Sequence, residues 1–216
     1  MLKVIIGIIA VLILVLFLIW HSRRDDSRHK LHGSGDRKKT EFWEWIFTPE
    51  YKRAGIRGEE AVVRAIESVL REGDNLLTNV SVEYDGKPAE LDNVIVNKYG
   101  VFIIEVKNYT GHVVGSEDDY EWQKFKTTDA GNTYVKTVKN PIKQVKRQIY
   151  ILARYLEYYG IRVWVKGYAI MLHGNSPVDS DYLLKSVEDI DQAIHTNDRT
   201  MLSTNTIERI AKLLSD

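Results

Sequence analysis

The sequence contains no cysteine, no internal repeat and no histidine cluster, and its formal net charge is zero. Without cysteine the fold cannot rely on disulfide bonds, which agrees with a reducing compartment. The absence of a repeat of fixed period excludes a solenoid. The six histidines show no metal-ligand spacing, and we assign them no chemistry. A metal or polyanion site would therefore have to come from carboxylates and from local clusters of lysine and arginine.

Long hydrophobic runs are also scarce, and the one that is long enough to span a bilayer lies at the N-terminus. Val4 to Trp20 is a stretch of 17 residues without a charged side chain. As a helix it would be about 26 Å long, near the lower limit for a membrane span. Residues 21–24 (HSRR) offer no small-residue cleavage site, which favours a retained anchor over a removable signal peptide. We therefore expect a transmembrane anchor over residues 1–20, in contact with the lipid bilayer through residues 4–20.

The next segment predicts the orientation of this anchor. Residues 21–40 form a basic polar linker with seven basic and three acidic residues. Lysine and arginine that flank a membrane helix stay on the cytoplasmic side. We expect a single-pass protein of the cell membrane, with residues 41–216 forming one cytoplasmic domain around a single core.

The fold of this domain is predicted from alternating strand and helix patterns. The β-rich runs 89–97 and 100–108 are separated by a short polar corner, which is typical of an antiparallel hairpin. Further strand and helix patterns cover residues 57–71, 141–159, 163–171, 187–195 and 205–214. The pattern indicates an α/β fold, with a mixed sheet flanked by helices and preceded by one transmembrane helix.

The expected hairpin brings four charged residues together. If Lys98 and Tyr99 form a two-residue loop, paired residue numbers sum to 197. The expected pairs are Val96–Val101, Val94–Ile103, Asp92–Glu105 and Glu90–Lys107. Two opposed carboxylates destabilise a sheet unless they are compensated, and Mg²⁺ or Mn²⁺ would compensate them. The alternative is a solvated face with a salt bridge between Glu90 and Lys107.

Two helices are expected to flank this charged face. Glu59 precedes Val62 and Val63 by helical spacing, so we expect it to project from the apolar face and to need a partner; a first-turn acid that favours the helix dipole is the alternative. Asn140 and Pro141 predict the start of the second helix, whose expected buried residues are Ile142, Val145, Ile149, Leu152 and Leu156. Lys143, Lys146 and Arg147 crowd its first turns and suit a polyanion, although a solvated helix face is the alternative.

These motifs together resemble the nuclease-related domain family, called NERD. The resemblance rests on Gly-x-x-Gly-Glu at 55–59, Glu-x-Asp at 90–92, Glu-x-Lys at 105–107, the following Gly111 and Trp122, and Asn-Pro-x-x-Gln at 140–144. It covers about residues 50–175, within the NERD-like segment 41–216. The family is placed in the PD-(D/E)xK nuclease superfamily, so the resemblance implies a restriction-endonuclease-like sheet.

The resemblance also implies roles for individual residues. Asp92 and Glu105 would bind the metal, Lys107 would orient or activate the attacking water, and Glu59 would complete the acidic site. Gln144 matches the family's glutamine and joins the expected catalytic set, while its chemical role stays open. We expect a Mg²⁺- or Mn²⁺-dependent nuclease acting on nucleic acid, with DNA favoured over RNA. The alternative is a catalytically inactive, membrane-tethered module that binds nucleic acid or protein.

Overall fold

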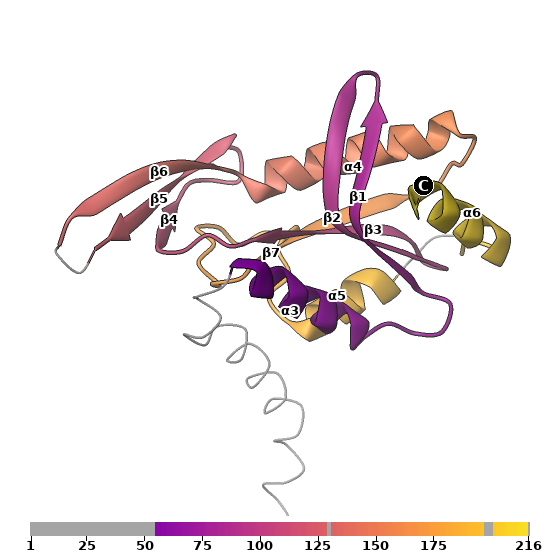
Figure 1. Ribbon diagram of the computed structural model, residues 1–216, viewed down its shortest axis with the longest axis horizontal. Helices are drawn as coiled ribbons and strands as arrows, with labels where there is room; N and C mark the ends of the chain where they lie inside the picture. The colour runs from indigo at the N-terminus through magenta and orange to yellow at the C-terminus, as the bar shows by residue number, and fades with distance from the viewer. Residues whose placement is uncertain (1–54, 129–130, 197–200, 216) are drawn as a thin grey trace, which may run out of the picture. The chain divides into compact units, whose positions relative to one another are not determined.

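A computed structural model describes residues 55–128, 131–196 and 201–215, all within one compact unit (Figure 1). The predicted anchor over residues 4–20 and the linker 21–40 lie outside the described residues. In the part of the chain that is described, none of the helices has the length and apolar character of a bilayer span. The helices are α3 (Gly55–Glu67), α4 (Pro141–Tyr158), α5 (Val187–His195) and α6 (Thr204–Ser215). The strands are β1 (Asn75–Tyr84), β2 (Lys87–Asn97), β3 (Gly100–Lys107), β4 (His112–Val114), β5 (Glu121–Thr127), β6 (Thr133–Lys139) and β7 (Val165–Met171).

The larger sheet has four strands in the order β1-β2-β3-β7. β1, β2 and β3 are antiparallel neighbours, whereas β7 is parallel to β3, so the predicted mixed sheet is confirmed. The Lys98–Tyr99 loop sets the predicted register, with Val96 paired to Val101 and Val94 to Ile103. The central strand β3 buries all of its side chains except that of Lys107, which is partly exposed, as expected of a strand covered on two faces.

The β1–β2 ribbon leaves β3 before the predicted charged pairs can form. Asn79 of β1 has a left-handed φ of 54°, and the β2–β3 ladder ends at the pair Asn93–Ile104. β2 buries Leu91 on the same core as Val94, so its inward face switches between these two residues. The predicted pairs Asp92–Glu105 and Glu90–Lys107 are therefore wrong, because the ribbon bends at the point where they would begin.

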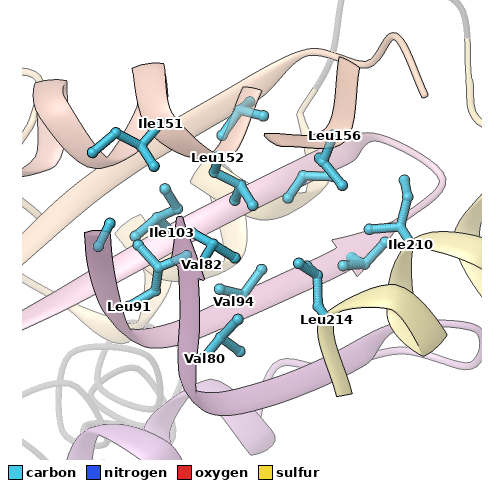
Figure 2. Close-up of a cluster of buried hydrophobic side chains, with 14 of the residues drawn as sticks. Val80, Val82, Leu91, Val94, Ile103, Ile151, Leu152, Leu156, Ile210 and Leu214 are labelled. Carbon is cyan, nitrogen blue, oxygen red and sulfur yellow. The ribbon is translucent and has the colours of Figure 1, made fainter. Parts of the chain in front are cut away.

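Helix α4 packs across the sheet and over the bent ribbon (Figure 1). Asn140 caps it as predicted: its side-chain oxygen accepts a 2.9 Å hydrogen bond from Ile142 N, and its amide nitrogen binds three carbonyls of the 116–119 loop. The buried face contains Gln148 and Ile151 in addition to predicted residues, while Ile149 is only partly buried. Ile151, Leu152 and Leu156 meet Ile210 and Leu214 of α6 over the sheet in the main core (Figure 2).

A second sheet, in the order β4-β5-β6, was not predicted from the sequence. It is held to the rest of the domain by Trp122, whose side chain is fully buried beside Ile142 and Val145 of α4. Its indole nitrogen donates a 2.8 Å hydrogen bond to Ser116 O. β6 has no fully buried residue, and this explains why its sequence gave no clear hydrophobic strand pattern.

Candidate active site

Glu105 of β3 is at the centre of the candidate site and is only 2% exposed. Its Oε1 atom accepts hydrogen bonds from Lys107 Nζ at 2.5 Å and from Gln144 Nε2 at 2.6 Å. Its Oε2 atom accepts a 2.6 Å hydrogen bond from Gln148 Nε2. Strand alternation explains why Lys107 reaches Glu105, since residues two apart share a face. The salt bridge of Lys107 is therefore made with Glu105 and not with Glu90.

Asp92 reaches the same region because of the bend in β2. Its Oδ2 atom accepts a 2.7 Å hydrogen bond from Val106 N, and the neighbouring Asn93 donates from Nδ2 to Ile104 O at 3.2 Å. Two side chains thus bind β3 backbone groups, Asn93 at the last pair of the strand ladder and Asp92 two residues beyond it. Burial, and secondarily the negative charge of Glu105, raises the pKa of Asp92 to about 6, although the Val106 hydrogen bond and Lys107 oppose this shift.

Glu59 does not occupy the position that its spacing predicted. It is exposed and does not project into the core, because the buried face of α3 is formed by Ala61, Val62, Ala65 and Ile66. It nevertheless lines a cleft of about 420 Å³ together with Asp92 and Asn93. Its charge contributes, as the smallest of the causes, to the raised pKa of Asp92. Glu59 is therefore close enough to act on Asp92 across the cleft.

Three buried amide oxygens in this region have no hydrogen-bond donor among the described residues. They are Asn93 Oδ1, Gln144 Oε1 and Gln148 Oε1. A carboxylate only accepts hydrogen bonds, so both glutamines must turn their nitrogens toward Glu105 and their oxygens away from it. Asn93 pairs with Ile104 and lines the cleft of Glu59 and Asp92, whereas the two glutamines lie beside Glu105. Because buried polar atoms are nearly always satisfied, the two glutamine oxygens beside Glu105 point to a group or water that binds there.

The carboxylate and amide oxygens of this region are the type of ligand that a hard divalent cation prefers. Asp92 has a carboxylate oxygen that is not used by Val106, and the charge of Glu105 is, after burial, the second cause of its raised pKa. In the described chain, no three His, Cys, Asp or Glu side chains are arranged as a ready-made metal cluster. Both Glu105 oxygens accept hydrogen bonds, so a cation would share this carboxylate with Lys107 and the glutamines, or displace them.

Comparison with known families identifies the domain that carries these residues. The family model described as "Nuclease-related domain" (NERD) matches residues 54–172, more than half of the chain. The chain belongs to the NERD family. An uncharacterized protein of Bacillus anthracis is 36% identical over 76 residues, which are 34% of this chain and 34% of that protein. The chain thus matches about a third of the relative's length, and no solved structure matches it.

Acidic residues of the 115–119 loop face the basic first turns of α4 in the NERD domain. Lys143 Nζ lies 3.4 Å from Asp118 Oδ1, and Lys146 Nζ lies 3.0 Å from Glu117 Oε1. The hydrogen bond from Lys146 lowers the pKa of Glu117. Arg147 donates to Pro88 O at 2.9 Å. All three predicted nucleic-acid-binding residues therefore have partners in the structure.

A second cleft lies beside these basic residues. Its volume is about 630 Å³, and it is lined in part by Tyr120, Lys139, Lys143 and the two glutamines that bind Glu105. Tyr120 is 85% exposed. The cleft therefore places cationic and aromatic side chains next to the amides that hold the buried carboxylate.

Two residues of the NERD site were missed in the sequence. Gln148 is 2% exposed and also donates to Glu90 O at 2.8 Å, so it ties Glu105 to the bent ribbon. Its position four residues after Gln144 on a helix could have revealed it. Tyr109 donates to Lys139 O at 3.0 Å, and burial followed by the charge of Glu105 raises its pKa to about 12. It lies in irregular chain after β3, where no sequence pattern indicated proximity to Glu105.

Proposed function

We propose that this NERD domain hydrolyses phosphodiester bonds of nucleic acid, with Mg²⁺ or Mn²⁺ held by Asp92 and Glu105. The observation that carries the proposal is the convergence of Asp92, Glu105 and Lys107 at the end of the β2–β3 ladder. These residues place carboxylate oxygens, which can bind a cation, next to the hydrogen-bond donor Lys107. A bound divalent cation would polarise the phosphate and lower the pKa of a water molecule.

The protein's own residues would position the reacting groups. Lys107 carries three hydrogen-bond donors on a flexible stem, so it can orient the attacking water or contact a phosphate oxygen. Gln144 and Gln148 hold the carboxylate plane of Glu105, and their outward oxygens can accept hydrogen bonds from water. Glu59 adds negative charge on the other side of Asp92, which favours cation binding at that carboxylate.

The same proposal assigns Lys143, Lys146 and Arg147 to the phosphate backbone of the substrate. Phosphates would have to replace Asp118 and Glu117 as the partners of the two lysines. This exchange is feasible because exposed ion pairs contribute little, typically less than about 1 kcal/mol. We expect DNA to be preferred over RNA.

A cleavage assay tests the proposal directly. The purified protein is incubated with single- and double-stranded DNA and RNA in the presence of Mg²⁺, Mn²⁺ or a chelator. We expect cleavage that requires the cation and is absent in the matched variant Glu105→Gln, which keeps the size of the side chain. Equal activity of wild type and variant, or activity in the chelator, would refute the assigned site.

One observation favours a second function, that of a binding module without turnover. Both oxygens of Glu105 already accept hydrogen bonds, so the site is compensated without a metal. Calorimetry with Mn²⁺ separates the two functions. A nuclease site should bind the ion in the wild type and lose it in Asp92→Ala, whereas a binding module should give the same titration for both proteins.

We also propose that residues 4–20 anchor the protein in the cell membrane with the NERD domain in the cytoplasm. The support comes from the apolar run and from the excess of basic residues in 21–40. The test is protease protection of a C-terminal tag in spheroplasts. We expect the tag to be digested only after lysis, and digestion before lysis would overturn the orientation.

A further inference from the structure

The β5–β6 hairpin places two lysines directly opposite each other. Lys124 pairs with Lys136, between the inner pair Trp122–Val138 and the outer pair Lys126–Tyr134. Like charges that face each other across a sheet destabilise it. This hairpin therefore carries a charge arrangement that works against its own stability.

These pairs lie on one face of the hairpin, because residues two apart along a strand share a face. The inner end of the face is buried through Trp122, and its outer part carries Lys124, Lys126, Lys136 and Tyr134. Among the described residues, no carboxylate forms an ion pair with any of these three lysines. They differ in this respect from Lys143 and Lys146 of α4, which are paired with Asp118 and Glu117.

The hairpin also begins next to the second cleft. Tyr120 directly precedes β5, and Lys139 ends β6; both line the cleft that contains Gln144 and Gln148. From there the hairpin extends away from the four-stranded sheet (Figure 1). A strand of nucleic acid that lies in the cleft would thus meet the hairpin as it leaves the site.

The spacing of the side chains suits a phosphate backbone. Lys124 and Lys126 are two residues apart on one face, which corresponds to about 6.8 Å along a strand. This distance is about twice the 3.4 Å axial rise per phosphate of one DNA strand. Tyr134 is 61% exposed beside Lys126, and an exposed aromatic ring can stack on an unpaired base.

We propose that Lys124, Lys126, Lys136 and Tyr134 form a nucleic-acid-binding face, the hairpin face, which holds the strand flanking the scissile bond. The inference rests on the proposed function, because it takes nucleic acid as the substrate. Phosphates bound between Lys124 and Lys136 would remove the repulsion between the two ammonium groups. The contacts are to the backbone and to base faces, so binding is independent of sequence.

The main test compares two triple variants of the full chain that change the net charge equally. The hairpin variant combines Lys124→Gln, Lys126→Gln and Lys136→Gln. The control combines Lys98→Gln, Lys166→Gln and Lys212→Gln, which lie in the β2–β3 turn, β7 and α6. Affinity for a 30-nucleotide strand is measured against salt concentration in a chelator, so that binding is read without cleavage.

We expect the hairpin variant to reduce the log-log salt slope by about 2 to 3 units, at roughly 0.7 to 0.9 per phosphate contact. The control should keep the wild-type slope. An unchanged slope in the hairpin variant, or an equal decrease in both variants, would overturn the inference. If the protein binds through the hairpin but never cleaves, the proposed hydrolysis fails while the hairpin face stands.

A single substitution separates binding from folding. Lys136→Glu turns the repulsive pair with Lys124 into an attractive one, so the melting temperature should stay equal or rise. Affinity for nucleic acid should nevertheless fall at least tenfold, because one phosphate contact is replaced by repulsion. A loss of affinity accompanied by a lower melting temperature would attribute the effect to folding and contradict the inference, as would full affinity.

Discussion

Two clusters of this domain bury a carboxylate, and they satisfy it in different ways. Beside α5, His195 donates or accepts through both ring nitrogens, to Asp74 at 2.8 Å and to Asp191 at 2.6 Å. Arg71 completes the cluster through its backbone nitrogen to Asp74 and its guanidinium to Asp191. None of these side chains has a buried polar atom without a partner among the described residues. The cluster around Glu105 instead leaves the amide oxygens of Gln144 and Gln148 without a partner among the described residues.

The difference separates a structural network from a site prepared for a ligand. In the His195 cluster the loop before β1 is tied to α5, because Asp74 and Asp191 both bind His195 and Asp191 also pairs with Arg71. In the Glu105 cluster, Asp92 has a raised pKa and lies against a cleft. Perturbed titration next to open space is typical of functional sites, whereas closed ion-pair networks more often hold elements together.

The largest expected effect separates the two clusters by activity. Glu105→Gln should reduce turnover at least 1000-fold, about 4 kcal/mol in the barrier, because a metal ligand is lost while the fold persists. Asp74→Asn, which also neutralises a buried carboxylate, should leave the turnover per folded molecule unchanged. Initial rates with saturating Mg²⁺, normalised to the folded fraction from circular dichroism, give the comparison. An equal loss of turnover in Asp74→Asn and Glu105→Gln would show that the two clusters do not differ in function.

The loss in free energy of unfolding should show the opposite order, with the larger loss in the His195 cluster. His195→Leu leaves Asp74 without its ring donor in a site where the Asp74 side chain is only 5% exposed. Removing the partner of a hydrogen bond to a buried carboxylate typically costs about 2 to 3 kcal/mol. Urea denaturation should show this loss for His195→Leu and a much smaller one for Glu105→Gln. Equal denaturation midpoints for wild type and His195→Leu would show that the network contributes no stability.

Lys107→Met tests the third role within the Glu105 cluster. The substitution should lower turnover about 100-fold, the lower range for a residue that assists proton transfer. Binding of Mn²⁺ should persist, because an ammonium group is not a metal ligand and its removal leaves Glu105 Oε1 with one hydrogen bond instead of two. Calorimetry and initial rates on the same preparation separate the two readouts. Unchanged turnover would reduce Lys107 to a structural partner of Glu105.

The sequence predicted the strongly patterned parts of the fold and failed where the backbone departs from a regular pattern. The Lys98–Tyr99 loop was enough to give the correct register near the turn. The left-handed residue Asn79 lies on the neighbouring strand, outside the hairpin from which the register was predicted, so the pairing of Asp92 was extrapolated too far. The second sheet was not predicted because most of its side chains are exposed, and its buried contacts to α4 come from few residues, chiefly Val113 and Trp122.

The sequence predicted which residues form the candidate site, but it did not predict the contacts between them. Family motifs selected Asp92, Glu105, Lys107 and Gln144, and the structure brings these residues together. The contacts between them depend on the bend in β2 and on the buried face of α4, which no local pattern determines. Gln148 lies beside the apolar stripe of its helix and was given no role, although its spacing from Gln144 places both side chains on one face.

The smallest expected effect is a pH dependence of stability, which we expect from the Glu105 cluster through Asp92 and not from the His195 cluster. Asp92 has its pKa raised from 3.8 to about 6, so the folded state favours its protonated form. The stabilisation from protonation is complete below about pH 3.8 and is lost as pH rises through 6. Asp92→Asn is neutral at every pH and should therefore be more stable than wild type at pH 7.5 in a chelator.

After allowance for the solvent contact of Asp92, we expect this advantage to be about 1 kcal/mol, and it should vanish near pH 4. Urea denaturation of both proteins from pH 4 to 7.5 measures it. Saturating Mg²⁺ should reverse the order at pH 7.5, because the ion stabilises the folded wild type, while the variant has lost one of the two carboxylates that would hold it. An advantage that does not vary with pH would mean that the carboxylate of Asp92 is already compensated, as Asp74 is, and the two clusters would then be alike.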